Sequence, residues 1–309
     1  MRMCHLFHIL IIHCKYLNII MQMKKILLSL LFLFLLGNID AQNFNFGIPK
    51  YENLDKYIVI DSAHIKCAYT LTYIKDTLKL QEKSVDKQVL LIGKNISKYY
   101  SQYALDYNLF LKKEISKGVE AVPTIPQKGA WSYELFKNYP SKKETVTDIS
   151  SMLHDNYLYE EDLPILSWKI SDGKQTIMSY SCQKATVSFR GRDFIAWFTT
   201  EIPTNNGPWK FGGLPGLILR LSDTKNHFVY QCDGLERLKT KEPIKFYKVE
   251  YTTLSRNELA KLYQRYHNDM AAFLKVMGIR VHEYDEKTNS TKKIEHSQEK
   301  IPYNPIELE

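Results

Sequence analysis

The chain has 309 residues, of which 44% are hydrophobic and 25% are charged, and its formal net charge is +8. This length suffices for one large domain or two small ones. The positive residues are scattered and do not form runs of five or six like charges, which argues against a dedicated nucleic-acid surface.

A segment near the N-terminus has the features of an export signal. Residues 23–25 are a short positive stretch, residues 26–36 are apolar except for Ser29, and Ala41 places a small residue ahead of Gln42. This order is typical of a secretory signal peptide. A membrane-spanning helix needs about 20 apolar residues, roughly twice the length of this run. We therefore expect residues 23–41 to be cleaved, and the product to be periplasmic, associated with the outer membrane or secreted, without a transmembrane span.

Residues 1–22 precede this signal and are interpreted as a mis-assigned start, with the true start at Met21 or Met23. The alternative is a crude metal cluster. Removing residues 1–41 takes away four basic residues and one acidic residue, which leaves a formal charge of +5. Such a mild excess of positive charge usually keeps a secreted protein soluble and does not indicate a binding surface. The residues that suggest a metal cluster are Cys4, His5, His8, His13 and Cys14.

Residues 42–280 are expected to form a single domain with many strands. Residues 64–73 alternate between apolar and polar side chains, which predicts a half-buried strand. Gly93-Lys94-Asn95 predicts a hairpin, and Asp172-Gly173 predicts a turn. Further strands are predicted at residues 89–92, 96–100, 131–136, 143–149, 152–159, 165–170, 177–189, 194–199, 217–221, 228–232 and 244–250.

Helical signals occur in two places. Residues 101–117 carry apolar side chains on one helical face. Ser255 and Glu258 have the spacing of a capping box, and apolar residues at helical spacing follow as far as Met277. Residues 281–309 are polar and are expected to form a C-terminal tail that is extended or partly disordered.

Many short strands with two or so helices, one of them C-terminal, predict an α+β fold. The strands are expected to form a curved antiparallel sheet, with a half-open barrel as one form that it can take. An alternation of strands and helices that would indicate a parallel sheet is absent from the pattern.

The stretch from Ile202 to Leu221 combines Gly and Pro with apolar residues. It reads IPTNNGPWKFGGLPGLILRL and holds four of the 13 glycines and three of the 11 prolines. Pro215 and Gly216 occupy the central positions of a predicted type II turn. Two interpretations remain open, a plug packed over one end of the sheet and a lid or ligand-binding lip. The candidate ligand-contacting residues of this loop are Trp209, Phe211, Gly212, Gly213, Leu214, Pro215 and Gly216.

Charged residues provide further candidate sites. Arg190, Arg192 and Asp193 flank a predicted turn, so they either bind an anionic group or pair with each other. The acidic cluster of residues 160–162 either holds a cation or faces solvent, which is the commoner case. A hydrolase would use Glu201, Arg192 and His227. The chain lacks GxSxG, HExxH, Walker and Rossmann motifs, so we predict no catalytic residues, metal or cofactor.

Three cysteines follow the predicted cleavage site. Cys182 and Cys232 lie in predicted strands near the Gly/Pro loop, and an exported chain can pair them. Pairing requires Cα atoms within about 7 Å of each other. The alternative is that Cys67, Cys182 and Cys232 are three buried free thiols. A CxxC redox motif is absent.

Several short motifs follow one another along the chain. They are Trp168, YSCQKA at 180–185, FRGR at 189–192, AWFT at 196–199, EIP at 201–203, GPWKF at 207–211, GGLPGLIL at 212–219 and NPIE at 304–307. In this order they resemble the GLPGLI family of exported Bacteroidetes proteins. The resemblance implies export and no established activity, and it supplies no catalytic residues. Its strand pattern is similar to that of half-open β-barrels of periplasmic lipid and lipoprotein carriers.

Three functions are compared. A periplasmic or envelope-associated binding or carrier protein for an apolar ligand is favoured, because 21 Tyr and 14 Phe supply many aromatic side chains on predicted strands. A structural or interaction protein of the envelope, which docks a partner through the tail and the Gly/Pro loop, is the alternative. A hydrolase is ranked last. The oligomeric state is left open.

Overall fold

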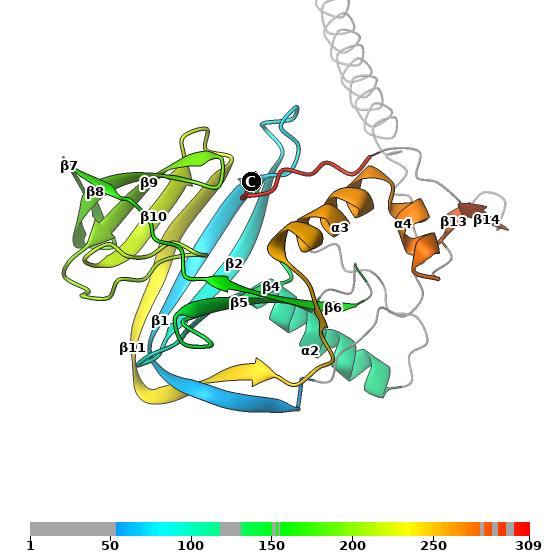
Figure 1. Ribbon diagram of the computed structural model, residues 1–309, viewed down its shortest axis with the longest axis horizontal. Coiled ribbons are helices and arrows are strands. Elements are labelled where there is room, and N and C mark those ends of the chain that lie inside the picture. Colours follow the sequence, from blue (N-terminus) through cyan, green and yellow to red (C-terminus); the bar gives the residue numbers. More distant parts are fainter. Residues whose placement is uncertain are drawn as a thin grey trace, which may run out of the picture. The chain divides into compact units, whose positions relative to one another are not determined.

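The computed structural model describes residues 54–117, 131–149, 153, 155–278, 281–285, 290–294 and 300–309. The main element of this part of the chain is one sheet of twelve strands (Figure 1). The strands are β1 (Tyr57–Ile74), β2 (Lys83–Ile92), β3 (Ser97–Ser101), β4 (Tyr133–Lys137), β5 (Lys143–Ile149), β6 (Asn156–Asp162), β7 (Lys169–Ile177), β8 (Tyr180–Phe189), β9 (Arg192–Thr199), β10 (Leu217–Asp223), β11 (Phe228–Tyr247) and β12 (Thr252–Thr253).

The strand order in this sheet is β12-β6-β5-β4-β3-β2-β1-β11-β10-β9-β8-β7. β12 pairs with β6 in parallel, and the other neighbours pair antiparallel. The predicted antiparallel sheet is therefore confirmed. β12 and β7 form its two edges, so the sheet is not closed in the described part of the chain.

β1 and β11 form the long centre of the sheet. They have 18 and 20 residues and pair from Tyr57 opposite Tyr247 to Tyr73 opposite Phe228. The register shifts at three places along β1, and such bulges bend a strand, as Figure 1 shows for both strands. Ile65, Cys67 and Tyr69 are buried while the residues between them are not, which is the period of two that the sequence predicted.

The predicted α+β class is wrong, because the protein is mainly β. Strands make up 50% of it and helices 16%. The difference comes from polar residues within strands. In β11 the residues between Asp233 and Lys241 are polar or partly exposed and still pair with β1 over much of their length. The predicted turn at Asp172-Gly173 is a bulge inside β7, and the chain turns instead at Met178 and Ser179, which both have positive φ.

Three short helices are found among the described residues: α2 (Gln102–Ser116), α3 (Arg256–Asn268) and α4 (Met270–Val276). The predicted capping box of Ser255 and Glu258 is present at the start of α3. The single long helix predicted after it is wrong, because Asp269 has extended backbone angles, ends α3 and caps α4 through its side chain. α2 packs against β2 and β3, where Leu105 contacts a core cluster that includes Ala63 and Phe136.

Some predicted segments lie outside the described residues, namely the start at 1–22 and the signal peptide at 23–41. β13 (Val281–Asp285) and β14 (Ser290–Ile294) form a separate two-stranded sheet. They lie in the region of the predicted tail. Residues 300–309 lie outside the helices and strands, and Ile306 is buried.

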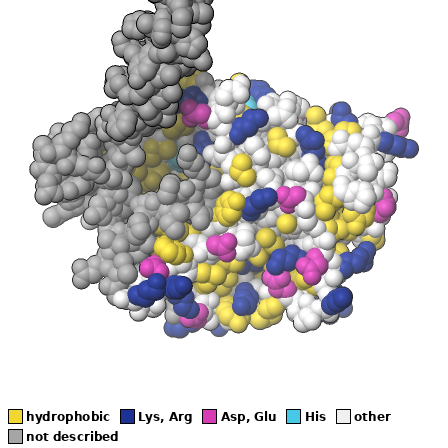
Figure 2. All heavy atoms as spheres, turned by 180° about the vertical axis from the view of Figure 1, so that it is seen from behind, with side chains coloured by type: hydrophobic (Ala, Val, Ile, Leu, Met, Phe, Trp, Pro, Cys, Tyr) yellow, Lys and Arg dark blue, Asp and Glu magenta, His cyan; other side chains and the backbone are white. Residues whose placement is uncertain are grey.

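The apolarity of the helices and the distribution of surface charge both bear on function. No helix in the described part of the chain has the length and apolarity needed to cross a membrane. On the face shown in Figure 2, Lys and Arg side chains are interspersed with Asp and Glu, which agrees with the scattered charge of the sequence.

Candidate functional site

The Gly/Pro loop packs into the core of the protein. The side chains of Trp209, Phe211 and Leu214 are at most 4% exposed. The ring of Phe211 lies 4.5 Å from that of Phe194, and the ring of Trp209 lies 5.7 Å from that of Trp131. The space beneath the loop is thus filled by the loop's own aromatic side chains.

The loop is held in shape by its backbone. Gly213 donates to the carbonyl of Asn205 at 2.9 Å, and Leu217 donates to that of Ile202 at 3.1 Å. The predicted type II turn at Pro215-Gly216 is wrong, because positive φ occurs at Gly213 and not at Gly216. Gly216 has another role. A Cβ there would lie 2.0 Å from the carbonyl oxygen of Thr199, so the close approach of two backbone segments requires a glycine.

Lys137, which belongs to β4 and not to the loop, forms hydrogen bonds with the loop. Its Nζ donates to Asn206 Oδ1 at 3.1 Å and to the carbonyls of Gly207 and Phe211 at 2.8 Å each. Burial lowers the pKa of Lys137 to about 7, while the three oxygen acceptors favour its charged form. Sequence reasoning missed this residue, since a lone lysine in a strand carries no signal of its partners.

Lys210 is the centre of a buried ionic cluster. Its side chain is 0% exposed, and its Nζ lies 3.5 Å from Glu144, 3.0 Å from Glu307 and within contact of Glu161. It also donates to the hydroxyl of Tyr159 at 3.0 Å. Burial alone would lower the pKa of Lys210, but Tyr159 and the three carboxyl groups raise it well above its ordinary value. Lys210 therefore carries a buried positive charge.

Glu144 and Glu161 lie directly opposite each other on β5 and β6. Burial, with the charge of Glu161 added to it, raises the pKa of Glu144 to about 8 despite the opposing effect of Lys210. Burial would also raise the pKa of Glu161, but Lys210 and a hydrogen bond from Arg190 hold it below its ordinary value. At neutral pH the pair thus consists of a protonated Glu144 and an ionised Glu161.

This pair makes the stability of the protein depend on pH. Because Glu144 has a folded pKa of about 8 and an ordinary value of 4.5, its stabilising proton is fully present below pH 4.5 and is lost as the pH rises through 8. We expect Glu144→Gln to gain about 1–2 kcal/mol relative to the wild type between pH 6 and pH 8. Urea denaturation at both pH values measures this difference.

A control for this experiment is Glu160→Gln, since Glu160 is exposed on the same strand as Glu161. It should follow the wild type at both pH values. A Glu144→Gln variant whose stability falls in parallel with the wild type from pH 6 to pH 8 would contradict the assignment of the proton to Glu144.

Arg190 and Arg192 bind groups of the chain itself. Arg190 Nη2 donates to Glu161 at 2.8 Å. Arg192 lies 3.5 Å from Asp223 and donates to Asn304 Oδ1 at 2.6 Å. Both arginines thus bind residues that are distant from them in the sequence, whereas Asp193 accepts a hydrogen bond from Ser188.

The residues considered for a hydrolase have separate partners. Glu201 accepts a hydrogen bond from the backbone of Ser181 at 2.8 Å, while Arg192 binds residues 304–306. The backbone carbonyl of His227 accepts from Ile74. Among the described residues, no metal-ligating group of three or more His, Cys, Asp or Glu side chains is found.

The three cysteines of the described residues are free thiols. Cys67, Cys182 and Cys232 are all buried, and β9 and β10 lie between the strands of Cys182 and Cys232 in the sheet. Burial raises the pKa of Cys232 to about 12, so its reactive thiolate is disfavoured.

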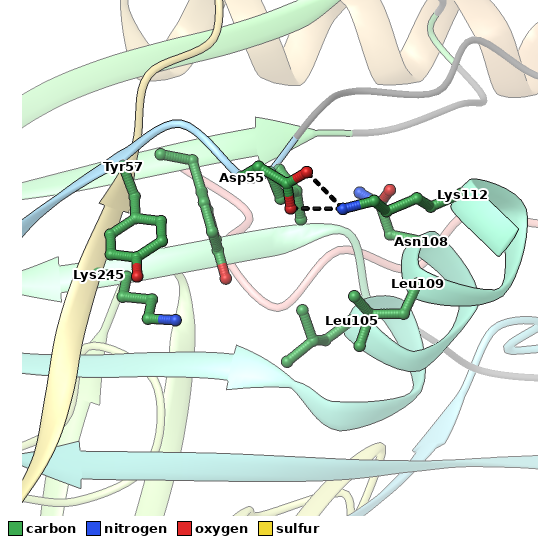
Figure 3. Close-up of a pocket in the computed structure, with 9 residues that line it drawn as sticks. Asp55, Tyr57, Leu105, Asn108, Leu109, Lys112 and Lys245 are labelled. Carbon is green, nitrogen blue, oxygen red and sulfur yellow. Dashed lines mark hydrogen bonds and ion pairs between the residues drawn. The ribbon is translucent and has the colours of Figure 1, made fainter. Parts of the chain in front are cut away.

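A groove lies between α2 and the ends of β1 and β11, away from the Gly/Pro loop (Figure 3). Its volume is about 250 Å³. Lys112 of α2 forms an ion pair with Asp55 at one side, and Lys245 Nζ lies 4.2 Å from the centre of the Tyr57 ring at the other. The lining residues are Leu54, Asp55, Tyr57, Leu105, Asn108, Leu109, Lys112, Lys245 and Tyr247. Sequence reasoning did not single out these residues, because they come from three separate elements.

One segment of the chain matches a family model of unknown function. Residues 190–220 match a family model described as "Protein of unknown function (Porph_ging)", a domain associated with Bacteroidetes. No curated protein matches the chain. The matched segment contains Arg190, Arg192 and Lys210, and thus much of the buried cluster.

Distant likenesses to solved structures were also found. Two structures of PNGF-II, in two different space groups, are 11% and 10% identical, with TM-scores of 0.46; 66% and 67% of this chain is covered. The chain spans about a third of their length, 33% and 34%. An uncharacterized conserved protein from Thermus thermophilus is 7% identical with a TM-score of 0.31, over 62% of this chain and 90% of that one.

Proposed function

We propose that the chain is an exported, non-enzymatic member of the GLPGLI family that binds a short apolar chain with an acidic head in the cell envelope. Family membership is supported by the ordered motifs from Trp168 to Leu221 and by the family match within them. Export is supported by the signal-like segment 23–41. The binding site that we propose is the groove between α2, β1 and β11, and the apolar character of its lining carries the proposal.

The groove gathers apolar side chains that face solvent. Tyr57 is 41% exposed and Leu109 is 51% exposed, and they lie with Leu105 around one hollow. Single exposed apolar residues are common on proteins, but a group of them marks a contact site. The groove is not the Gly/Pro loop that the sequence suggested as a lid or ligand-binding lip, where the buried side chains of Trp209 and Phe211 fill the space.

The size and charge of the groove define the ligand. Small-molecule pockets have volumes of roughly 300–1,000 Å³, so 250 Å³ suits a short chain or the end of a longer one. No carboxylate in the described part of the chain lies within ion-pair distance of Lys245, which is half-buried at the groove. A ligand carboxylate beside Lys245 would supply the missing negative charge. Asn108 Oδ1 is buried without a hydrogen-bond partner among the described residues and would accept a ligand donor.

Binding of dodecanoate to the full chain, followed by isothermal titration calorimetry, tests this function. We expect saturable binding with one site, and at least a tenfold weaker affinity in Leu109→Gln, since removing about 1.4 kcal/mol of apolar contact changes affinity tenfold. Leu109 is exposed on a helix and Gln has a similar helix propensity, so the variant should fold.

A matched control is Leu78→Gln, since Leu78 is 92% exposed and does not line the groove. It should bind dodecanoate like the wild type. The proposal fails if the wild type does not bind, or if the two variants lose affinity equally.

A further inference from the structure

Residues 304–309, here called the strap, are bound by side chains of the matched segment 190–220. Arg192 donates to Asn304 Oδ1 at 2.6 Å, to the Pro305 carbonyl at 2.7 Å and to the Ile306 carbonyl at 3.0 Å. The backbone of Leu308 donates to the carbonyl of Arg190 at 2.9 Å. Within the described part of the chain the strap pairs with no strand of the sheet, so its release would break no sheet ladder there.

The carboxylate of Glu307 is the most strongly bound group of the strap. It accepts from Trp209 Nε1 at 3.0 Å and lies 3.0 Å from Lys210 Nζ. Arg190 and Arg256 approach it at 3.9 and 3.6 Å. Charge-assisted contacts of this kind are about twice as strong as neutral ones, so the site selects a carboxylate over an amide.

Asn304 is recognised at both ends of its side-chain amide. Its oxygen accepts from Arg192, and its nitrogen donates to the carbonyl of Ile74 at 2.7 Å. An aspartate lacks the donor and an alanine lacks both groups. Ile306 is 7% exposed and adds an apolar contact. The site is therefore expected to be specific for the sequence Asn-Pro-Ile-Glu, and not only for a negative charge.

The basic side chains of the binding site would still attract an acidic ligand if the strap were released. Lys210, Arg190 and Arg256 would then face only Glu161 and Glu144 among the described acidic residues. Three basic side chains against two acidic ones leave an excess that favours an acidic ligand. The strap also runs close to the backbone of Gly191. A Cβ at this position would lie only 3.0 Å from Leu308 Cβ, so the lack of a side chain on Gly191 leaves room for the strap.

We propose that Arg190, Arg192, Trp209 and Lys210 form a binding site for extended acidic peptides of the type Asn-Pro-apolar-Glu. The strap fills this site in its own chain, and the strap of a second copy is the ligand that it takes in trans. Exchange of an identical element between copies creates dimers at little energetic cost, because the same contacts form in both states. This site is separate from the groove, so it does not depend on the proposed ligand.

Peptide binding to a full chain with a weakened strap tests the site. The double variant Asn304→Ala/Glu307→Gln keeps every residue of the binding site. We expect a labelled peptide of residues 304–309 to bind it at least tenfold more tightly than the wild type, whose own strap competes. The same peptide with Gln in place of Glu307 should bind at least tenfold more weakly. Fluorescence anisotropy measures both affinities.

Two further measurements complete the test. If circular dichroism shows that the double variant is unfolded, the milder Ile306→Ala variant replaces it with the same expectations. Light scattering at rising concentration should show dimers of the wild type and fewer dimers of the double variant. The peptide site is overturned if a folded variant does not bind the peptide or binds both peptides alike, and exchange between copies is overturned if wild-type dimers are absent.

Discussion

Replacing Lys210 with Met should lower the free energy of unfolding by about 3–5 kcal/mol, because removing one partner from a buried ion pair leaves an uncompensated charge. Glu161 and Glu307 both contact the Lys210 ammonium, and both lose it in this variant. Met fills a similar volume without a charge, so the loss reflects electrostatics rather than a cavity. Guanidinium denaturation at pH 7 measures the difference.

A surface ion pair provides the control for this variant. Lys66 lies 2.9 Å from Glu242, and both side chains are 34% exposed. Exposed pairs contribute about 0–1 kcal/mol, so Lys66→Met should change stability by no more than that. Equal losses of unfolding free energy in Lys66→Met and Lys210→Met would show that the buried cluster stabilises the protein no more than a surface ion pair. Arg190 and Arg256 remain near the carboxylates in Lys210→Met, and they limit the loss to the stated range.

Local patterns predicted the parts of the fold that depend on local physics. The alternation at residues 64–73 gave the face of β1 that is buried, and the spacing of Ser255 and Glu258 placed the start of α3. β7 was misjudged because most of its side chains are exposed, so it has the composition of a loop. Strand pairing there is decided by β8, which no local pattern records.

The candidate site was predictable in part. The Gly/Pro loop was located by its composition, and Arg190 and Arg192 were selected beside it. Glu161 belongs to the acidic cluster that was expected either to hold a cation or, more commonly, to face solvent, whereas it contacts the fully buried Lys210. Its partners come from β5, the loop and the strap, which are separated along the chain by many residues. Only the register of β5 and β6 brings Glu144 opposite Glu161, and register is not visible in either segment alone.

The second large effect is expected at Gly216, where no side chain fits. A Cβ at this position would lie 2.0 Å from Thr199 O and 2.6 Å from Thr199 C. Both are backbone atoms at the end of β9, so a rotamer change cannot relieve the contact and the backbone itself must shift. Overpacking commonly costs about 1–3 kcal/mol, and we expect Gly216→Ala to reach or exceed about 3 kcal/mol of lost stability in urea denaturation.

Gly213→Ala is the matched control in the same loop. A Cβ on Gly213 meets no atom closer than 4.0 Å, but φ there is +82°. Its cost is therefore the conformational penalty of a left-handed residue, about 1–2 kcal/mol. If Gly213→Ala proves more destabilising than Gly216→Ala, the close approach to Thr199 is not what requires a glycine in the GLPGLI motif, and backbone conformation at Gly213 is the stronger constraint.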